Sequence, residues 1–200
     1  MSALGSHIRA VVFDFDGTLF HLPIDFAAFR REMGLTEEDK VGTALQDWTD
    51  AGDDERLAVV TRYERESVPA GRFTPGAQEA LRALRTTHRV AVLTRNSRHS
   101  VTDALGDLAD GLHIVGREDV KRLKPDPEGL FTALGLLDAR PAESAMVGDT
   151  FHDVEAAKSA GLRSIVLRNP KLAYAPKGAD VYIETLTELV EATSTGAETS

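Results

Sequence analysis

The sequence predicts an α/β protein: a doubly wound, mostly parallel sheet with a small all-helical segment inserted after the first strand. Short apolar runs alternate with segments of helical periodicity, which is typical of a parallel sheet covered on both faces. The stretch 23–72 interrupts this alternation, with apolar residues at three- and four-residue spacing and no clear strand. We therefore expect an α/β core at 8–22 and 73–192, a helical cap at 23–72, and flexible termini at 1–7 and 193–200.

Each element has its own signal. The apolar runs predict strands at 9–15, 90–93, 112–115, 144–148, 164–167 and 179–183. In the insert, a first helical pattern stops at Gly34, Thr36 and three following acids predict the cap of a second helix, and a third helix is expected at about 55–67. Further helices are expected at 77–85, 100–105, 127–134, 150–160 and 186–192.

Composition narrows the function classes. The 200 residues are 42% hydrophobic, enough for one domain with a core, and the formal net charge of -9 argues against sequence-independent binding of nucleic acid. The absence of cysteine excludes disulfides, thiolate catalysis and cysteine-based zinc sites. No apolar run is long enough for a membrane span, and residues 1–7 lack the apolar core of a signal peptide. We expect a cytoplasmic protein, monomeric or homodimeric, with no membrane or nucleic-acid partner.

The first strand ends in an acidic turn, Asp14-Phe15-Asp16-Gly17. Side chains two apart in a strand point to the same side, so Asp14 and Asp16 are expected to face one site and to need a cation or a shared proton. Gly17 permits a tight turn and a close approach of the backbone to a ligand. An ordinary strand end with a solvated acidic turn is the alternative, but this order favours a metal-dependent phosphate site.

Other strands of the predicted sheet also end in polar residues. Thr94 and Asn96 follow the run 90–93, and Asp149 follows the run 144–148. Because ligands bind beyond the carboxyl ends of parallel strands, these side chains are expected at one site, with the insert lying above it as a lid. Carboxylate and carbonyl oxygens favour a hard cation, and Mg²⁺ is the natural choice. A lone His152 is weak evidence for zinc, since no second histidine lies at ligand spacing.

Four motifs occur in order: Asp14-Phe15-Asp16-Gly17-Thr18, Leu93-Thr94, Lys124-Pro125-Asp126-Pro127 and Gly148-Asp149-Thr150-Phe151-His152-Asp153. Together they make the chain resemble the haloacid-dehalogenase-like hydrolases, closest to the phosphoglycolate-phosphatase-like branch with a small helical cap. The resemblance implies an α/β core of Rossmann-like type and a phosphatase that hydrolyses a small phosphorylated metabolite through an aspartyl-phosphate intermediate. A metabolite like phosphoglycolate is one candidate substrate.

The resemblance also assigns roles to residues. Asp14 is the expected nucleophile and Asp16 the general acid and base. Thr94, Arg95 and Lys124 are expected to bind phosphate, and the Mg²⁺ ligands are expected to be Asp14, Asp16 through its carbonyl, and Asp149. Supporting roles are expected for Gly17, Asn96, Gly148 and Asp153, and His21 is a candidate substrate contact.

Several alternatives stay open. Thr94 can instead cap a helix, Lys124 can be a solvated loop lysine, Asp153 can be an ordinary first-turn acid, and His21 can be a surface residue. Arginines of the insert could supply a positive group for a substrate carboxylate or second phosphate, although most are expected to be solvated; they are Arg30, Arg31, Arg56, Arg62 and Arg65. A phosphomutase and a non-catalytic binding module are the competing functions, whereas a dehalogenase is disfavoured by Asp16 and Asp149.

Overall fold

A computed structural model describes residues 3–169 and 176–190 of the chain. Six strands form one sheet in which every neighbouring pair is parallel. In spatial order they are β5 (His113–Val115), β4 (Arg89–Leu93), β1 (Ala10–Phe13), β6 (Ser144–Gly148), β7 (Arg163–Leu167) and β8 (Val181–Ile183). The predicted α/β fold with a parallel sheet is therefore confirmed.

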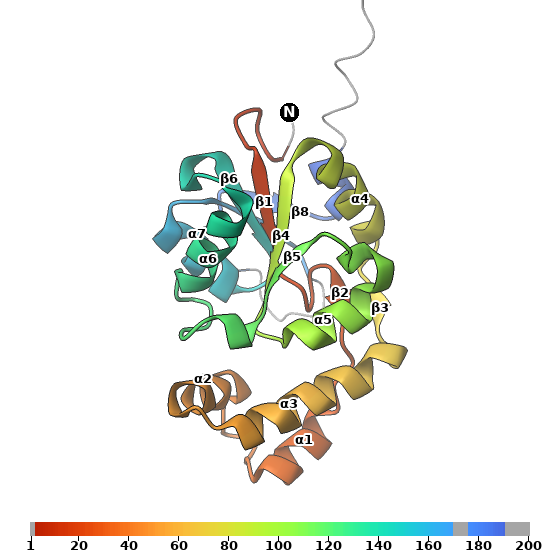
Figure 1. Cartoon of the computed structure of the whole chain (residues 1–200), viewed down its shortest axis with the longest axis vertical. Helices are drawn as coiled ribbons and strands as arrows, with labels where there is room; N and C mark the ends of the chain where they lie inside the picture. The colour runs from red at the N-terminus through yellow and green to blue at the C-terminus, as the bar shows by residue number, and fades with distance from the viewer. Residues whose placement is uncertain (1–2, 170–175, 191–200) are drawn as a thin grey trace, which may run out of the picture.

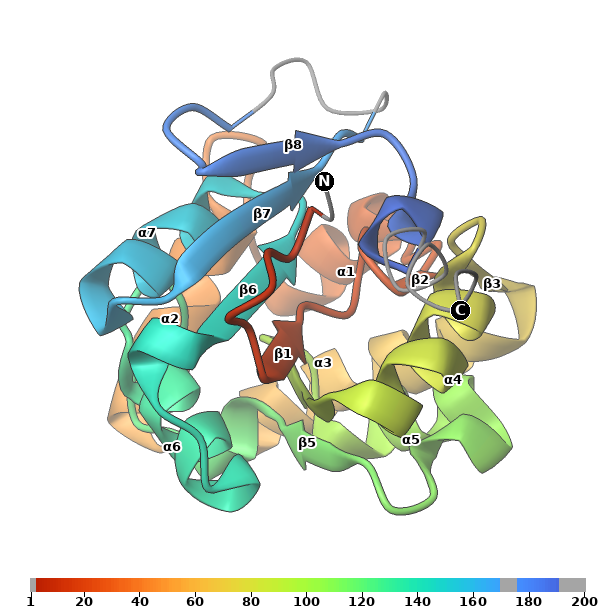
Figure 2. The same cartoon turned by 90° about the horizontal axis from the view of Figure 1, so that it is seen from above.

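Helices cover both faces of this sheet (Figures 1 and 2). One face packs against α4 (Ala77–Thr87) and α5 (Arg98–Leu105), and the other against α6 (Glu128–Leu137) and α7 (Phe151–Ala160). All four residues of β1 are buried, as expected for a central strand with helices on both sides. None of the helices in the described ranges is long and apolar enough to cross a membrane.

The insert, residues 23–72, forms a separate helical layer beyond the carboxyl ends of the strands (Figure 1). Its helices are α1 (Phe26–Met33), α2 (Val41–Ala51) and α3 (Asp54–Ser67), followed by the 3₁₀ helix Val68–Ala70. Asp25 and Asp53 accept backbone hydrogen bonds at the starts of α1 and α3, and Gly34 ends α1 in the left-handed conformation at φ 67°.

The two connections between insert and core lie side by side. β2 (Phe20–His21) pairs antiparallel with β3 (Arg72–Phe73), so the stretch expected to hold no strand has one residue, Arg72, in a short strand. The ring of Phe20 stacks on Phe15 at 5.6 Å and meets Phe73 edge-on at 5.2 Å between ring centroids. This aromatic packing fixes where the insert leaves and rejoins the core.

Three local expectations need correction. Thr36 does not cap the second helix: its hydroxyl and N–H donate to the Asp39 carboxylate in a separate turn, and α2 begins at Val41. Residues Leu186–Leu189 form a 3₁₀ helix rather than an α-helix. Leu4, placed in a flexible terminus, is buried in the core. Residues 191 and 192 of the expected last helix, and the 193–200 tail, lie outside the described residues.

Three further 3₁₀ helices lie in the connections of the core: Gly106–Ala109, Arg117–Asp119 and Pro141–Glu143. The second follows β5 at the carboxyl edge of the sheet and carries a buried arginine toward the insert.

Candidate active site

A buried lysine joins two acids at the carboxyl edge of the sheet. The Lys124 ammonium Nζ lies 2.6 Å from Asp14 Oδ1, just past β1, and 2.6 Å from Asp153 Oδ1 in the first turn of α7. All three side chains are nearly inaccessible to solvent, so Lys124 is not a solvated loop lysine. Asp153 also accepts hydrogen bonds at Oδ2 from the Thr150 hydroxyl and N–H, which makes it a helix cap as well as a member of this cluster.

A third carboxylate completes the cluster. One ligand oxygen each from Asp14, Asp149 and Asp153 lies within 4.8 Å of the others. Asp149 Oδ2 accepts a hydrogen bond of 2.8 Å from Asn169 Nδ2, whereas the buried Oδ1 of Asp149 has no hydrogen-bond partner. A buried carboxylate oxygen without a partner is costly unless a cation binds it.

Two glycines permit this crowding. A Cβ at Gly17, whose φ is +89°, would lie 2.3 Å from Asp149 Oδ2. A Cβ at Gly148 would lie 2.2 Å from Asp153 Cγ. Both distances are below any real contact, so the positions predicted as supporting glycines hold the two acids close to the backbone.

The electrostatics call for another positive charge. Burial raises the pKa of Asp14 to about 8 although Lys124 opposes the shift, and burial also raises the pKa of Asp149 to about 6. Burial lowers the pKa of Lys124, but Asp14 and Asp153 outweigh it, so the net shift is upward and the amine stays charged. One ammonium among three carboxylates leaves an excess of negative charge, and an all-oxygen donor set suits a divalent cation such as Mg²⁺.

Asp16 is positioned by the tight turn that follows β1. The Phe15 carbonyl accepts hydrogen bonds from the N–H groups of Thr18, Leu19 and Phe20, and this folds the chain back immediately after Asp16. Asp16 Oδ1 accepts a hydrogen bond of 2.9 Å from the Leu22 N–H. Burial raises the pKa of Asp16 to about 6, a value suited to donating and accepting a proton near neutral pH.

Thr94 and Asn96 form a small network below the insert. The Thr94 hydroxyl donates to Asn96 Oδ1 at 2.9 Å and accepts from the Asn96 N–H, while Asn96 Nδ2 donates to Glu64 Oε1 of α3 at 3.1 Å. The N-cap of α5 is Ser97, so the alternative that Thr94 caps this helix is wrong.

Arg95 spans from the core to the insert. Its guanidinium donates to the Gly42 carbonyl of α2 at 2.6 Å and lies 3.4 Å from His152 Nε2. Burial lowers the pKa of His152 to about 4, so the ring is neutral and Nε2 can accept this hydrogen bond. The buried Nε of Arg95 has no hydrogen-bond partner and remains a donor for a ligand.

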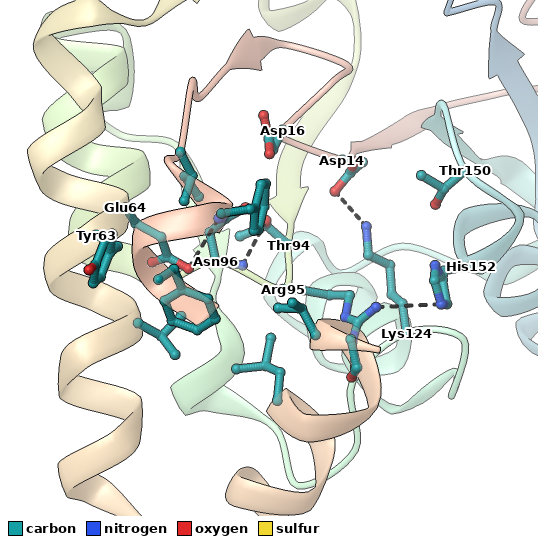
Figure 3. Close-up of a pocket in the computed structure, with 17 residues that line it drawn as sticks. Asp14, Asp16, Tyr63, Glu64, Thr94, Arg95, Asn96, Lys124, Thr150 and His152 are labelled. Carbon is teal, nitrogen blue, oxygen red and sulfur yellow. Dashed lines mark hydrogen bonds and ion pairs between the residues drawn. The ribbon is translucent and has the colours of Figure 1, made fainter. Parts of the chain in front are cut away.

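These groups border one cavity of about 330 Å³ between the core and the insert (Figure 3). The predicted site residues that line it are Asp14, Asp16, Thr94, Arg95, Asn96 and Lys124. Asp149 and Asp153 lie next to it through the carboxylate cluster. His21 does not line it: with Gly17, Arg72 and Asn169, His21 borders a second hollow.

Four residues at the site had no role predicted from the sequence. Thr150 and His152, which belong to the fourth motif, line the cavity beside Lys124. Asn169, in the segment after β7, donates to Asp149, and Glu64 of α3 binds Asn96. Glu64 lies one helical turn after Val60 on the inner face of α3. A charged residue at a position where the helical pattern calls for an apolar one was the only feature of the sequence that could have indicated a role for Glu64. No comparable signal marks Asn169.

Comparison with known proteins identifies the family to which the chain belongs. A family model for haloacid dehalogenase-like hydrolases matches residues 8–161. An uncharacterised hydrolase of Saccharomyces cerevisiae is 31% identical over 92% of this chain and 90% of its own length. A phosphoglycolate phosphatase of Chromobacterium violaceum is 29% identical over 95% and 98% of the two chains. A hydrolase structure from Pseudomonas syringae shares the fold, with a TM-score of 0.74 at 21% identity over 95% and 100%.

The fold and the acidic strand ends define an α/β protein with a buried carboxylate–lysine centre. The chain belongs to the haloacid dehalogenase-like hydrolases, since the family model covers more than half of it. The predicted family, its branch containing the phosphoglycolate phosphatases, and the enzyme class of phosphoric monoester hydrolases are thereby confirmed.

Proposed function

We propose that the protein is a Mg²⁺-dependent phosphatase that hydrolyses a small phosphomonoester through an aspartyl-phosphate intermediate. The observation that carries this proposal is the arrangement of Asp14, Asp149 and Asp153 within 4.8 Å around the Lys124 ammonium, at the base of a cavity that Asp16 also lines. In this proposal residues 8–22 and 73–192 are the catalytic core and residues 23–72 are the cap.

In the first step, an Asp14 carboxylate oxygen attacks phosphorus and the bond from phosphorus to the leaving-group oxygen breaks. The protonated Asp16 gives its proton to that leaving oxygen. Lys124 and Arg95 offset the charge of the phosphoryl oxygens, and the Thr94 hydroxyl turns its proton from Asn96 Oδ1 to one of those oxygens when the substrate binds. The alcohol then departs and Asp14 carries the phosphoryl group.

In the second step, Asp16 takes a proton from a water molecule whose oxygen attacks phosphorus, and the bond from phosphorus to Asp14 breaks. Inorganic phosphate leaves, Asp14 is again a carboxylate and Asp16 again an acid. Asp14, Asp149 and the Asp16 carbonyl would hold the metal, with Asp153 in support. When bound, Mg²⁺ supplies positive charge that stabilises the carboxylates and the phosphoryl oxygens together.

The cavity disfavours the phosphomutase alternative. A mutase must hold a second phosphate away from the reacting one, which requires basic groups in the cap. Every described side chain of the insert that lines the cavity is apolar or aromatic except the acid Glu64. A hydrolase that releases its product needs no such second site.

The test uses an aryl phosphate in Mg²⁺ buffer. Asp14→Asn removes the nucleophile and is expected to abolish turnover, whereas Asp47→Asn, on an exposed position of α2, should match the parent enzyme. Omission of Mg²⁺ with a chelator should abolish turnover in the parent enzyme and in Asp47→Asn. Activity retained by Asp14→Asn would overturn the nucleophile assignment, and activity retained in chelator would overturn the metal requirement.

The intermediate has its own measurement. In Asp16→Asn an aryl phosphate with a good leaving group can still transfer its phosphoryl group, but water is no longer activated by a carboxylate. Intact-protein mass spectrometry should then show one added phosphoryl group, and the double variant with Asp14→Asn should show none.

A further inference from the structure

The cavity has two chemically different walls. The core supplies polar and charged groups, and the insert supplies an apolar roof. Seven apolar or aromatic side chains form this roof: Ile24, Phe26, Phe29, Val41, Leu45, Val60 and Tyr63. The polar groups of the core are those that the proposed reaction at phosphate needs. The roof therefore faces the leaving group, which is the part of the substrate that is not phosphate.

The one charged side chain that the described part of the insert adds beside the roof, Glu64, is already neutralised. Both Glu64 oxygens accept hydrogen bonds from the Arg117 guanidinium, at 2.6 and 3.2 Å. The Ser97 N–H and the Ser100 hydroxyl also donate to Glu64, at 3.0 and 2.9 Å. Glu64 therefore braces the roof against the core and has little capacity left to bind a ligand.

The remaining polar group of the roof is also engaged. The Tyr63 hydroxyl donates to Glu32 Oε2 at 2.8 Å, and the Tyr63 ring meets Phe29 edge-on at 5.3 Å between centroids. The roof thus presents the Tyr63 ring, rather than its hydroxyl, as part of an aromatic surface.

The basic residues of the insert do not reach the cavity. Arg56 pairs with Asp53, Arg62 pairs with Glu32 and Glu66, and Arg65 pairs with Asp103 on the core. Arg30 donates to the Thr36 and Asp39 carbonyls. None of these arginines, nor Arg31, lines the cavity, so the roof offers no counterion to a substrate carboxylate.

We propose that the substrate is a phosphomonoester with a compact apolar leaving group, such as an aromatic ring or a short branched alkyl group, and that carboxylated or doubly phosphorylated esters are poor substrates. The inference rests on the proposed phosphatase function and specifies its substrate class. The cationic side chains that line the cavity, Lys124 and Arg95, are assigned to the phosphate in the proposed function. An ionised group placed against the apolar side chains of the roof would therefore lose its hydration without gaining a counterion, whereas an apolar group gains burial. Phe26, 48% exposed at the cavity, is an apolar surface that such a group would cover.

Cavity size limits the leaving group further. A volume of about 330 Å³ lies near the lower end of the roughly 300–1,000 Å³ typical of small-molecule sites. Because the phosphate occupies part of that volume, a single ring or its equivalent is the size that fits.

The first test compares para-tolyl phosphate with para-carboxyphenyl phosphate in Mg²⁺ buffer. The two esters have similar size, and the carboxylate does not make its phenolate a poorer leaving group. A preference for the tolyl ester therefore measures the effect of the apolar roof on binding of the leaving group. We expect kcat/KM to favour the tolyl ester by about 10-fold or more, as for an unpaired charge facing an apolar wall. Equal values, or a preference for the carboxylated ester, would overturn the inference while leaving the phosphatase function intact.

A charge placed in the roof should reverse this preference. Phe26→Arg puts a cation at the cavity, and its neighbour Ala27→Arg puts the same cation on an exposed position of α1 that does not line it. The tolyl-to-carboxyphenyl ratio of kcat/KM should fall by about 10-fold in Phe26→Arg, because a counterion now meets the carboxylate, and stay unchanged in Ala27→Arg. The same ratio in both variants would contradict the proposed position of the leaving group.

A binding experiment separates this inference from the chemistry. Para-methylbenzylphosphonate and para-carboxybenzylphosphonate cannot be hydrolysed, and calorimetry with Mg²⁺ gives their affinities directly. Tighter binding of the methyl compound with no turnover of any ester would overturn the phosphatase proposal but support the preference of the roof for an apolar group. Equal affinities, tighter binding of the carboxylated compound, or no binding of either would overturn the substrate class.

Discussion

Glu64 of α3 and Arg117 of the 3₁₀ helix after β5 form an ion pair with an N–O distance of 2.6 Å, and each side chain is only 3% exposed. The pair joins the insert to the core across 53 positions of sequence. Arg117 Nη2 also donates to the Thr61 hydroxyl at 2.6 Å, which adds a second contact with α3. This buried pair is therefore one of the contacts that hold α3 over the site.

Loss of one partner of this pair should be strongly destabilising. Glu64→Gln leaves the Arg117 guanidinium buried without a counterion, so we expect the free energy of unfolding to fall by about 3–5 kcal/mol. Glu66→Gln is the matched control, because Glu66 lies two positions away on the same helix in an exposed pair with Arg62 and should cost about 0–1 kcal/mol. Urea unfolding of both variants measures the difference, and equal small losses would contradict the role given to the buried pair.

The acidic edge of the sheet could be predicted because it depends on local sequence. Strand ends are visible as the points where apolar runs stop, and parallel topology then brings Asp14, Thr94 and Asp149 to one edge. Gly17 and Gly148 were predictable for the same reason, since each adjoins an acid at a strand end.

Contacts between the insert and the core were not predictable in this way. Glu64 and Arg117 look like ordinary helix and loop charges, and their pairing depends on how two distant segments pack. The prediction that Thr36 caps a helix was wrong for a related reason. Threonine followed by acids is equally suited to a closed turn, and here the Asp39 carboxylate accepts hydrogen bonds from both the N–H and the hydroxyl of Thr36.

The glycine next to the carboxylate cluster gives a second prediction. Gly17→Ala should abolish Mg²⁺-dependent turnover, because its Cβ would lie 2.3 Å from Asp149 Oδ2 and must displace that carboxylate. Gly34→Ala is the control: its φ of +67° is equally unfavourable for alanine, but nothing lies within 4 Å of the new Cβ. It should lose about 1–2 kcal/mol of stability and keep its activity. Activity assays paired with thermal unfolding separate the two effects, and an active Gly17→Ala enzyme would contradict the close approach.

Removal of the buried ammonium gives a third prediction. Lys124→Met should lower kcat by about 10²–10³, as is typical when one electrostatic contact to the reacting group is lost. Without Lys124 the acids Asp14 and Asp153 face each other with no cation, so added Mg²⁺ should raise the melting temperature more in this variant than in the parent. Lys121→Met, on an exposed loop position nearby, should behave like the parent in both assays. An unchanged Mg²⁺ shift in Lys124→Met would argue that the cation binds away from these acids.

The last prediction concerns Asn169, which donates to Asp149 Oδ2 at 2.8 Å from the segment after β7. Groups that orient a metal ligand without touching the metal are commonly worth about 10–100-fold in metal affinity. We therefore expect Asn169→Ala to need about 10–100-fold more Mg²⁺ for half-maximal activity and to recover the parent kcat when Mg²⁺ is saturating. Arg168→Ala changes the adjacent residue, whose guanidinium pairs with Glu184 instead, and should leave the Mg²⁺ requirement unchanged. A kcat that stays low at saturating Mg²⁺ would mean that Asn169 acts on the reacting groups, because an orienting residue alone affects only how readily the cation binds.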